Sequence, residues 1–170
     1  TDKALLARSL SLPDFVMVAN NQNEVDPQAI HQAREKIKNH LATTFEAKFL
    51  KVFEDNKDSG AYSPSAKDMG QRALKNSALN FLLFANEAKA ISLAKAQFDA
   101  ATNMTDRAAA LSVLADTNSS ERKQALESFY DDYKDYQLVV DKLFTMQAMA
   151  DRPQIFDDLK DFPLLFPTFL

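Results

Sequence analysis

Apolar residues recur along most of the chain at intervals of three, four and seven positions, the spacing that one face of a helix requires. The clearest stripe lies between residues 26 and 56 and comprises Ile30, Ile37, Leu41, Phe45, Phe49, Val52 and Phe53. Asp26 is a favoured helix N-cap, and Pro27 suits the first helical position, where its missing N–H costs nothing. This pattern predicts one long helix, or two helices that meet near Thr43 and Thr44.

A second long helix is expected after the polar stretch 57–64, which contains Gly60 and is the clearest loop in the chain. Its inward residues are expected to be Met69, Ala73, Leu74, Ala78, Phe81 and Leu82. Gly70 inside this helix costs up to about 1 kcal/mol relative to alanine. Such a glycine is tolerable if another helix packs closely against it.

Shorter helical patterns fill the rest of the chain, in the ranges 4–12, 86–101, 103–116, 118–135, 136–150 and 153–162. The stretch 15–24 is ambiguous and could be a short helix or a buried loop. Helices of this length, joined by short polar links, are typical of stacked helix pairs. We therefore predict an all-α fold, with antiparallel helix pairs stacked as an α-solenoid or superhelical bundle.

Two of these patterns suggest caps. In the segment NMTDRAAALSVLAD, which begins at Asn103, Thr105 is the expected cap and Asp106 favours the positive end of the helix dipole. The alanines that follow allow close helix packing, as expected for a tight layer between helix pairs. Asn118 and Glu121 resemble a capping box, with asparagine replacing the usual serine or threonine.

Composition supports a helical fold and excludes several classes of function. Glycine occurs only twice in 170 residues, whereas alanine, leucine, lysine and glutamate are abundant. The net charge of −4 comes with no basic stripe, so we expect no nucleic-acid partner. The absence of cysteine excludes disulfides, cysteine-ligated zinc and thiol catalysis. The longest apolar run is far shorter than the ~20 residues of a membrane span, so we expect no membrane partner.

No catalytic constellation emerges from the candidate residues. His31 and His40 are nine positions apart, which places them on opposite faces of a straight helix, so we predict no metal site. The carboxylates Asp131, Asp132 and Asp135 share helix faces and could serve acid–base work or bind a hard cation. Lysines interrupt this group and no calcium-loop pattern is present, so a solvated face edged by tyrosines is the favoured interpretation. We assign no catalytic, cofactor-binding or metal-binding residue.

The segment AQFDAATNMTDRAAALSVL, which spans residues 96–114, resembles the C-terminal helical domain of bacterial aminopeptidase N, the alanyl-aminopeptidase branch of the zinc gluzincins. That family has Phe, Ala and Asn before Met-Thr-Asp and then a run of Ala and Leu. The matching residues are Phe98, Ala100 or Ala101, Asn103, Met104, Thr105, Asp106 and the run 108–114. Thr102 departs from the second asparagine often found in the family.

Other segments are similar to the same family in the same order. They are LLARSLSLPD at 5–14, VDPQAIHQAREKIKNHLA at 25–42, RALKNSALNFL at 72–82 and YDDYKDYQLVVDKLFTMQA at 130–148. In the last of these, Leu143 replaces a family tryptophan. The resemblance runs from about Leu5 to Lys160, and several collinear motifs are more specific than any one alone.

The resemblance implies a non-catalytic part of a zinc-dependent metallopeptidase that removes N-terminal residues from peptides. In this family a separate catalytic domain carries the H-E-x-x-H zinc motif, and the helical domain roofs the active-site chamber and gates access to it. Neither H-E-x-x-H nor G-x-M-E-N occurs in this chain, so zinc is expected in the missing catalytic domain and the chain alone is expected to be inactive. The implied partners are the rest of the parent enzyme in cis and its peptide substrates, and the implied location is cytoplasmic.

The pattern gives residues 1–161 as the helical-repeat domain and residues 162–170 as an apolar tail. Pro163 and Pro167 forbid a regular helix in the tail, which could mediate self-association. The start at Thr1, within a helical pattern, indicates a fragment or a processed or trimmed product. Two rival hypotheses remain: a stand-alone helical-repeat module that binds a peptide or protein, and an independent enzyme that uses the Asp131, Asp132 and Asp135 face.

Overall fold

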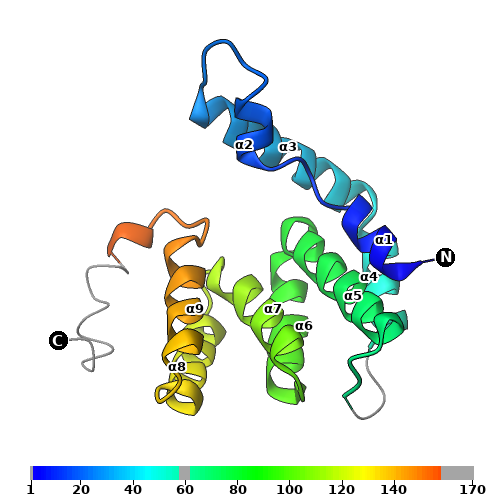
Figure 1. Ribbon diagram of the computed structural model, residues 1–170, viewed down its shortest axis with the longest axis vertical. Coiled ribbons are helices and arrows are strands. Elements are labelled where there is room, and N and C mark those ends of the chain that lie inside the picture. Colours follow the sequence, from blue (N-terminus) through cyan, green and yellow to red (C-terminus); the bar gives the residue numbers. More distant parts are fainter. Residues whose placement is uncertain (1, 58–61, 158–170) are drawn as a thin grey trace. The chain divides into compact units, whose positions relative to one another are not determined.

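The computed structural model describes residues 2–57 and 62–157, and within them every regular element is a helix (Figure 1). The chain divides into two compact units, Thr1–Leu93 and Ala94–Leu170. The predicted all-α class is confirmed. Helix α6 (Glu87–Ala100) begins in the first unit and ends in the second.

The first unit is organised around the long helix α5 (Ala66–Ala85). Three helices pack against α5, namely α1 (Lys3–Ser9), α3 (Pro27–Thr44) and α4 (Glu46–Asp55), whereas the short helix α2 (Phe15–Ala19) packs against α3. The rings of Phe49 in α4 and Phe81 in α5 stack with centroids 4.5 Å apart. Because α2 spans Phe15–Ala19, the ambiguous stretch 15–24 is helical at its start.

The α3 start follows the predicted signals, and the helix then ends near the predicted bend. The Asp26 side chain accepts a hydrogen bond from the Ala29 N–H at 2.9 Å, and Pro27 occupies the first helical position. The Thr43 hydroxyl donates to the backbone of Asn39 at 2.8 Å, a bond that bends helices. Phe45, with φ −117° and ψ 20°, then separates α3 from α4. Two helices therefore form rather than one.

Two residues of the predicted α3–α4 stripe are partly exposed. Ile37 retains 48% and Phe45 retains 38% of its accessible surface, whereas Ile30, Phe49 and Phe53 are buried. A stripe continues across two helices only if their axes stay aligned.

The buried face of α5 is rotated relative to the predicted one. Met69 is 57% exposed and Ala73 is exposed, whereas Leu74, Ala78, Phe81 and Leu82 are buried as expected. Arg72 and Lys75 are buried instead. Arg72 donates to the Ser63 carbonyl at 2.9 Å and lies 5.0 Å from the centre of the Tyr62 ring. The loop before α5 therefore covers a face that periodicity alone assigns to solvent.

Gly70 marks a close helix contact, as expected from its position inside α5. A β-carbon at residue 70 would lie 2.9 Å from the Ala4 backbone nitrogen and 3.3 Å from its β-carbon. Real β-carbons do not approach backbone atoms so closely, so only glycine allows α1 to pack here. The glycine thus brings two helices together at a point where any side chain would hold them apart.

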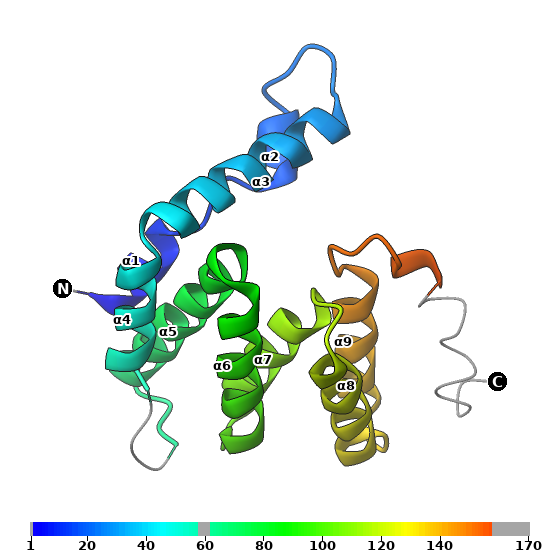
Figure 2. The ribbon, with the colours of Figure 1, turned by 180° about the vertical axis from the view of Figure 1, so that it is seen from behind.

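The second unit contains the end of α6 and three further helices, α7 (Met104–Ala115), α8 (Ser120–Tyr133) and α9 (Gln137–Ala148). Helix α7 packs against α8 and α9, and α8 and α9 run side by side in opposite directions in both ribbon views (Figures 1 and 2). The fully buried side chains of this unit include Leu111, Leu114, Phe129 and Leu143.

Both predicted caps in this unit are shifted. Asn103 rather than Thr105 caps α7, and Ser119 rather than Asn118 caps α8, where its hydroxyl accepts from the Arg122 N–H at 3.2 Å. Asn118 accepts hydrogen bonds from the Arg152 guanidinium instead. Asn, Ser and Thr compete for the same role, so adjacent candidates cannot be ranked from sequence. The last predicted helix is described only to residue 157, and the apolar tail 162–170 lies outside the described residues.

Candidate functional site

The segment NMTD at the start of α7 forms a reciprocal cap. Asn103 accepts a hydrogen bond from the Asp106 N–H at 2.9 Å, and its amide group donates to the Asp106 carboxylate at 3.2 Å. The Gln97 amide of α6 donates to the Asp106 carbonyl at 2.9 Å. Asp106 is only 3% exposed, so this carboxylate is buried at the positive end of the helix and serves the cap. The signal that sequence reasoning missed is the Asn-x-x-Asp spacing, a variant of the capping box.

The alanine run that follows lies in a packed layer. Ala110 and Ala115 are buried, Ala108 and Ala109 are half-buried, and the helix contacts both α8 and α9. Small side chains let helix axes approach closely, as expected from the sequence. The segment therefore has a role in packing.

Arg107, also in α7, lies at the centre of an aromatic cluster of the second unit. Its guanidinium carbon lies 4.7 Å from the ring centre of Phe98, 5.4 Å from that of Tyr133 and 5.9 Å from that of Phe129. It also forms an ion pair with Asp132. A planar cation over aromatic faces and beside a carboxylate is a strong structural anchor. Arg107 thus ties the end of α6 and the first turn of α7 to α8.

The predicted carboxylate face does not form on one helix. Helix α8 ends at Tyr133, so Asp135 lies in the turn beyond it, where the sequence pattern had placed it on the helix. Asp132 is held by Arg107, and Asp131 lies 3.9 Å from the Lys134 ammonium group. All three aspartates are exposed, as expected for the solvated-face interpretation.

The two histidines lie on α3, and both are exposed. Their nine-residue separation is that of opposite helix faces, which is unlike the four-residue spacing of a helical zinc motif.

Two half-buried acidic residues in first helical turns have lowered pKa values. Hydrogen bonds from Ser65 and then Ser63 lower the pKa of Asp68 from its ordinary value. The pKa of Glu121 is lowered chiefly by a hydrogen bond from its own backbone N–H, and then by one from Ser120. Both shifts favour the charged form at a helix start and so belong to capping.

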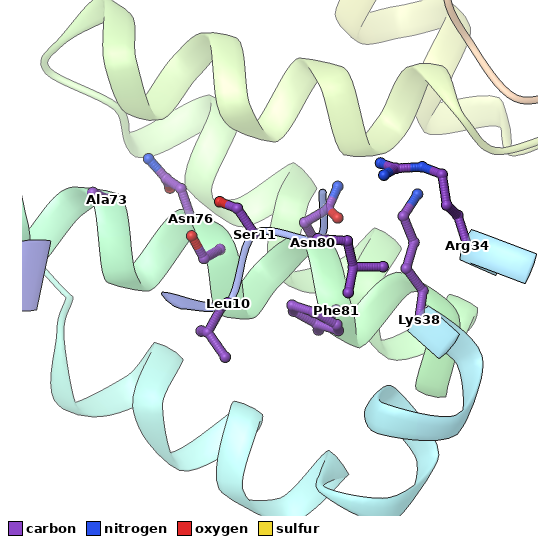
Figure 3. A pocket seen from close by; sticks show the side chains of 10 residues that line it. Leu10, Ser11, Arg34, Lys38, Ala73, Asn76, Asn80 and Phe81 are labelled. Carbon is purple, nitrogen blue, oxygen red and sulfur yellow. The ribbon is translucent and has the colours of Figure 1, made fainter. Parts of the chain in front are cut away.

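The first unit contains a hollow of about 420 Å³ that sequence reasoning missed. Its walls come from the segment after α1, from α3 and from α5 (Figure 3). The lining residues are Leu10, Ser11, Leu12, Arg34, Lys38, Ala73, Asn76, Ser77, Asn80 and Phe81. Residues so distant in the sequence give no local signal of a shared cavity.

No helix in the described part of the chain is both long and apolar enough to cross a membrane.

Known proteins resemble this chain over nearly its whole length. The family described as "Domain of unknown function (DUF3458_C) ARM repeats" matches residues 1–163. Aminopeptidase N of Escherichia coli is 32% identical over 94% of this chain, and Aminopeptidase N of Caulobacter vibrioides is 30% identical over 89%. These alignments span only 18% and 17% of the two relatives, so the chain corresponds to about a fifth of their length.

A solved structure shows the same relationship. The crystal structure of Legionella pneumophila aminopeptidase A in complex with aspartic acid matches 96% of this chain with a TM-score of 0.81 and 28% identity. The match covers 20% of that chain. The chain therefore belongs to the DUF3458_C family of ARM-repeat domains and corresponds to the C-terminal helical domain of the aminopeptidase N relatives.

Proposed function

We propose that this chain is a non-catalytic part of a zinc-dependent aminopeptidase that removes N-terminal residues from peptides. In this role it roofs the active-site chamber and gates the access of peptides. The observation that carries the proposal is the collinear similarity to Aminopeptidase N over 94% of the chain and only 18% of that protein. The partners are then the rest of the parent enzyme in cis and the peptides in its chamber.

Side chains of the second unit support a structural role for this chain. Asp132 belongs to the acidic cluster that could serve acid–base work, and it forms an ion pair with Arg107. Asp106 is part of a helix cap. In a zinc aminopeptidase the metal polarises the peptide carbonyl and activates water. The residues of this chain would hold neither zinc nor the attacking water, and their part is to shape and support the chamber.

The first test uses the isolated chain. Zinc content is measured by mass spectrometry after dialysis against micromolar zinc, and hydrolysis of alanine p-nitroanilide is followed spectrophotometrically. We expect neither stoichiometric zinc nor turnover. Either result, if removed by Asp132→Asn but not by Asp131→Asn, would instead identify an enzyme that uses Asp132 of α8.

The second test addresses the roofing role in the full-length parent. Ala110→Leu enlarges a fully buried side chain in the α7 layer, whereas Ala148→Leu enlarges an exposed one at the end of α9. We expect Ala110→Leu alone to change the ratio of long-peptide cleavage to alanine p-nitroanilide cleavage. An unchanged ratio, in an enzyme whose helical domain is measurably destabilised, would contradict a role in gating.

The domain limits and the location belong to the same proposal. Residues 1–161 form the helical-repeat part, with 162–170 as a separate apolar tail, and the parent enzyme is cytoplasmic. The lack of cysteine is compatible with a reducing compartment. Fractionation of cells that express the tagged parent tests the location, and recovery of the enzyme outside the cytoplasm would contradict it.

A further inference from the structure

Arg34 is one of the two cationic residues that line the hollow in the first unit. Its Nη1 atom is buried, yet it has no hydrogen-bond partner among residues 2–57 and 62–157. A buried donor without a partner loses its hydration without compensation. In a cavity wall, such a donor can be satisfied by water or by a ligand that accepts hydrogen bonds.

Lys38, the other cation of the hollow, is already partnered. Its ammonium group lies 2.9 Å from the Glu35 carboxylate and 4.8 Å from the centre of the Phe84 ring. Glu35 therefore neutralises Lys38 and leaves the guanidinium of Arg34 as the excess charge. Figure 3 shows Arg34 and Lys38 extending from the same helix, α3.

The remaining wall combines neutral hydrogen-bonding groups with apolar surface. Asn80 and Asn76 of α5 project toward the hollow, and Ser11 faces them from the segment after α1 (Figure 3). Leu10, Leu12 and Phe81 supply the apolar part. None of the ten lining residues is acidic, so the lining carries net positive charge. The volume of about 420 Å³ falls within the range of roughly 300–1,000 Å³ that is common for small-molecule sites.

We propose that this hollow binds a small oxyanion, with the Arg34 guanidinium as its anchor and the Asn80 amide as a second donor. A guanidinium offers two parallel N–H donors to two oxygens of one anionic group, which suits both carboxylate and phosphate. The apolar wall would hold the body of an organic acid, whereas inorganic phosphate would use the polar wall alone. The site lies wholly within the first unit and does not depend on the proposed aminopeptidase function.

The test is a titration of the ¹⁵N-labelled full chain with sodium butyrate and, separately, with inorganic phosphate, at constant ionic strength and pH. We expect saturable shifts of the Asn80 side-chain amide and the Ser77 backbone amide with at least one of the two probes. Saturation with butyrate alone identifies an organic acid, and saturation with phosphate identifies the free anion. No saturable shift with either probe overturns the proposal.

Arg34→Gln and Lys36→Gln form a matched pair on α3, because both remove one positive charge and only Arg34 lines the hollow. Loss of a charged hydrogen-bonding group predicts at least about tenfold weaker binding for Arg34→Gln, whereas an exposed, screened charge predicts less than about twofold for Lys36→Gln. Equal weakening in both would mean a diffuse surface attraction and would overturn the proposal.

A second pair keeps the test decisive if Arg34→Gln disturbs folding, which circular dichroism monitors. Asn80→Asp places a carboxylate at the exposed rim of the hollow, whereas Gln32→Glu adds the same charge to α3 away from the lining residues. We expect Asn80→Asp to abolish binding through repulsion of the anion, and Gln32→Glu to leave it within twofold of the original (roughly, as for a screened surface charge). Undiminished binding in Asn80→Asp would overturn the proposed site.

Discussion

Asn103 and Asp106 each satisfy a polar group of the other, with the Asp106 N–H donating to the Asn103 side chain at 2.9 Å and the Asn103 amide donating to the Asp106 carboxylate at 3.2 Å. The pair starts α7 and explains why an acidic residue is buried there. The most characteristic segment of the chain is thus an element of architecture.

The sequence alone does not show whether Asn103 or Thr105 caps α7, and in the structure Asn103 is the cap. Asn103→Ala removes the observed cap and should lower the free energy of unfolding by about 1 kcal/mol. Thr105→Ala, at the position expected from sequence, should change it by less than about 0.5 kcal/mol because Thr105 is exposed. Urea denaturation of both variants measures the difference. A larger loss in Thr105→Ala would mean that the helix starts differently in solution.

Because the alanines of α7 lie in a packed layer, the free energy of unfolding should depend strongly on side-chain size there. Ala110→Leu inserts extra volume at a position with no exposed surface and should cost about 1–3 kcal/mol. Ala148→Leu, at an exposed position, should have an effect within about 0.5 kcal/mol. Equal unfolding curves for the two variants would show that α7 is not packed between its neighbours.

The contacts of Arg107 predict that the planar shape of its guanidinium contributes more to stability than its positive charge does. Arg107→Lys keeps the positive charge but loses the planar contact with Phe98 and Tyr133, so it should lower the free energy of unfolding by about 1–2 kcal/mol. Asp132→Asn should cost at most about 1 kcal/mol, since its side chain is 50% exposed.

Asp131→Asn is the matched control for the cluster, because Asp131 lies on the same helix and its carboxylate is 3.9 Å from the ammonium group of Lys134. It should have no measurable effect at moderate salt. If Arg107→Lys proves as mild as Asp131→Asn, the aromatic contacts of the guanidinium contribute little to stability.

The relationship between Gly70 and Ala4 predicts an unusual response to alanine. Gly70→Ala would normally stabilise a helix by up to about 1 kcal/mol. Here the added β-carbon would meet a backbone nitrogen at 2.9 Å, so a net loss of about 1–3 kcal/mol is expected.

A second substitution separates backbone from side-chain crowding. Ala4→Gly removes the side-chain contact at 3.3 Å but leaves the backbone contact in place. The double variant Ala4→Gly/Gly70→Ala should therefore regain little of the loss. Full recovery would show that only the two β-carbons clash, and a stabilised Gly70→Ala single variant would contradict the close contact altogether.

The lowered pKa of Asp68 predicts a specific response to acid. Ser65 donates to the Asp68 carboxylate at 2.7 Å, so the charged form is favoured in the folded state. Its contribution to stability is present above the unfolded pKa, near the ordinary value of 3.8, and is lost as the pH falls through the lower folded value.

Ser65→Ala removes the largest cause of that shift. We expect the pKa of Asp68, followed by carboxyl ¹³C NMR, to rise toward its ordinary value. Glu121 should keep its lowered pKa in this variant, because Ser120 and its own backbone cause that shift. An unmoved Asp68 titration would mean that the serine hydroxyl points elsewhere in solution.

Local sequence rules predicted much of this fold because they describe interactions within one helix. Asp26 and Pro27 start α3 as expected, and the ranges 86–101 and 103–116 match α6 and α7 closely. The sequence did not predict which face of a helix is covered by its neighbours. Met69 is exposed because α5 turns a different face toward its neighbours, a choice that apolar spacing within α5 does not contain.

The candidate sites were less predictable for the same reason. Arg107 and Asp132 are 25 residues apart, and the lining of the hollow runs from Leu10 to Phe81. Composition could exclude cysteine chemistry, and motif spacing could exclude a helical histidine pair. A cavity made by three separate segments becomes visible only when tertiary packing brings them together.

Helix α1 has only seven residues, which is too short for a stable helix in water on its own. Its order therefore depends on α5, through the glycine contact and the burial of Ala7. Local opening of the chain should begin where the fewest apolar groups are buried, so α1 should exchange its amide hydrogens well before α5 does. A single glycine thus decides whether the start of the chain behaves as part of the folded unit or as a fluctuating arm.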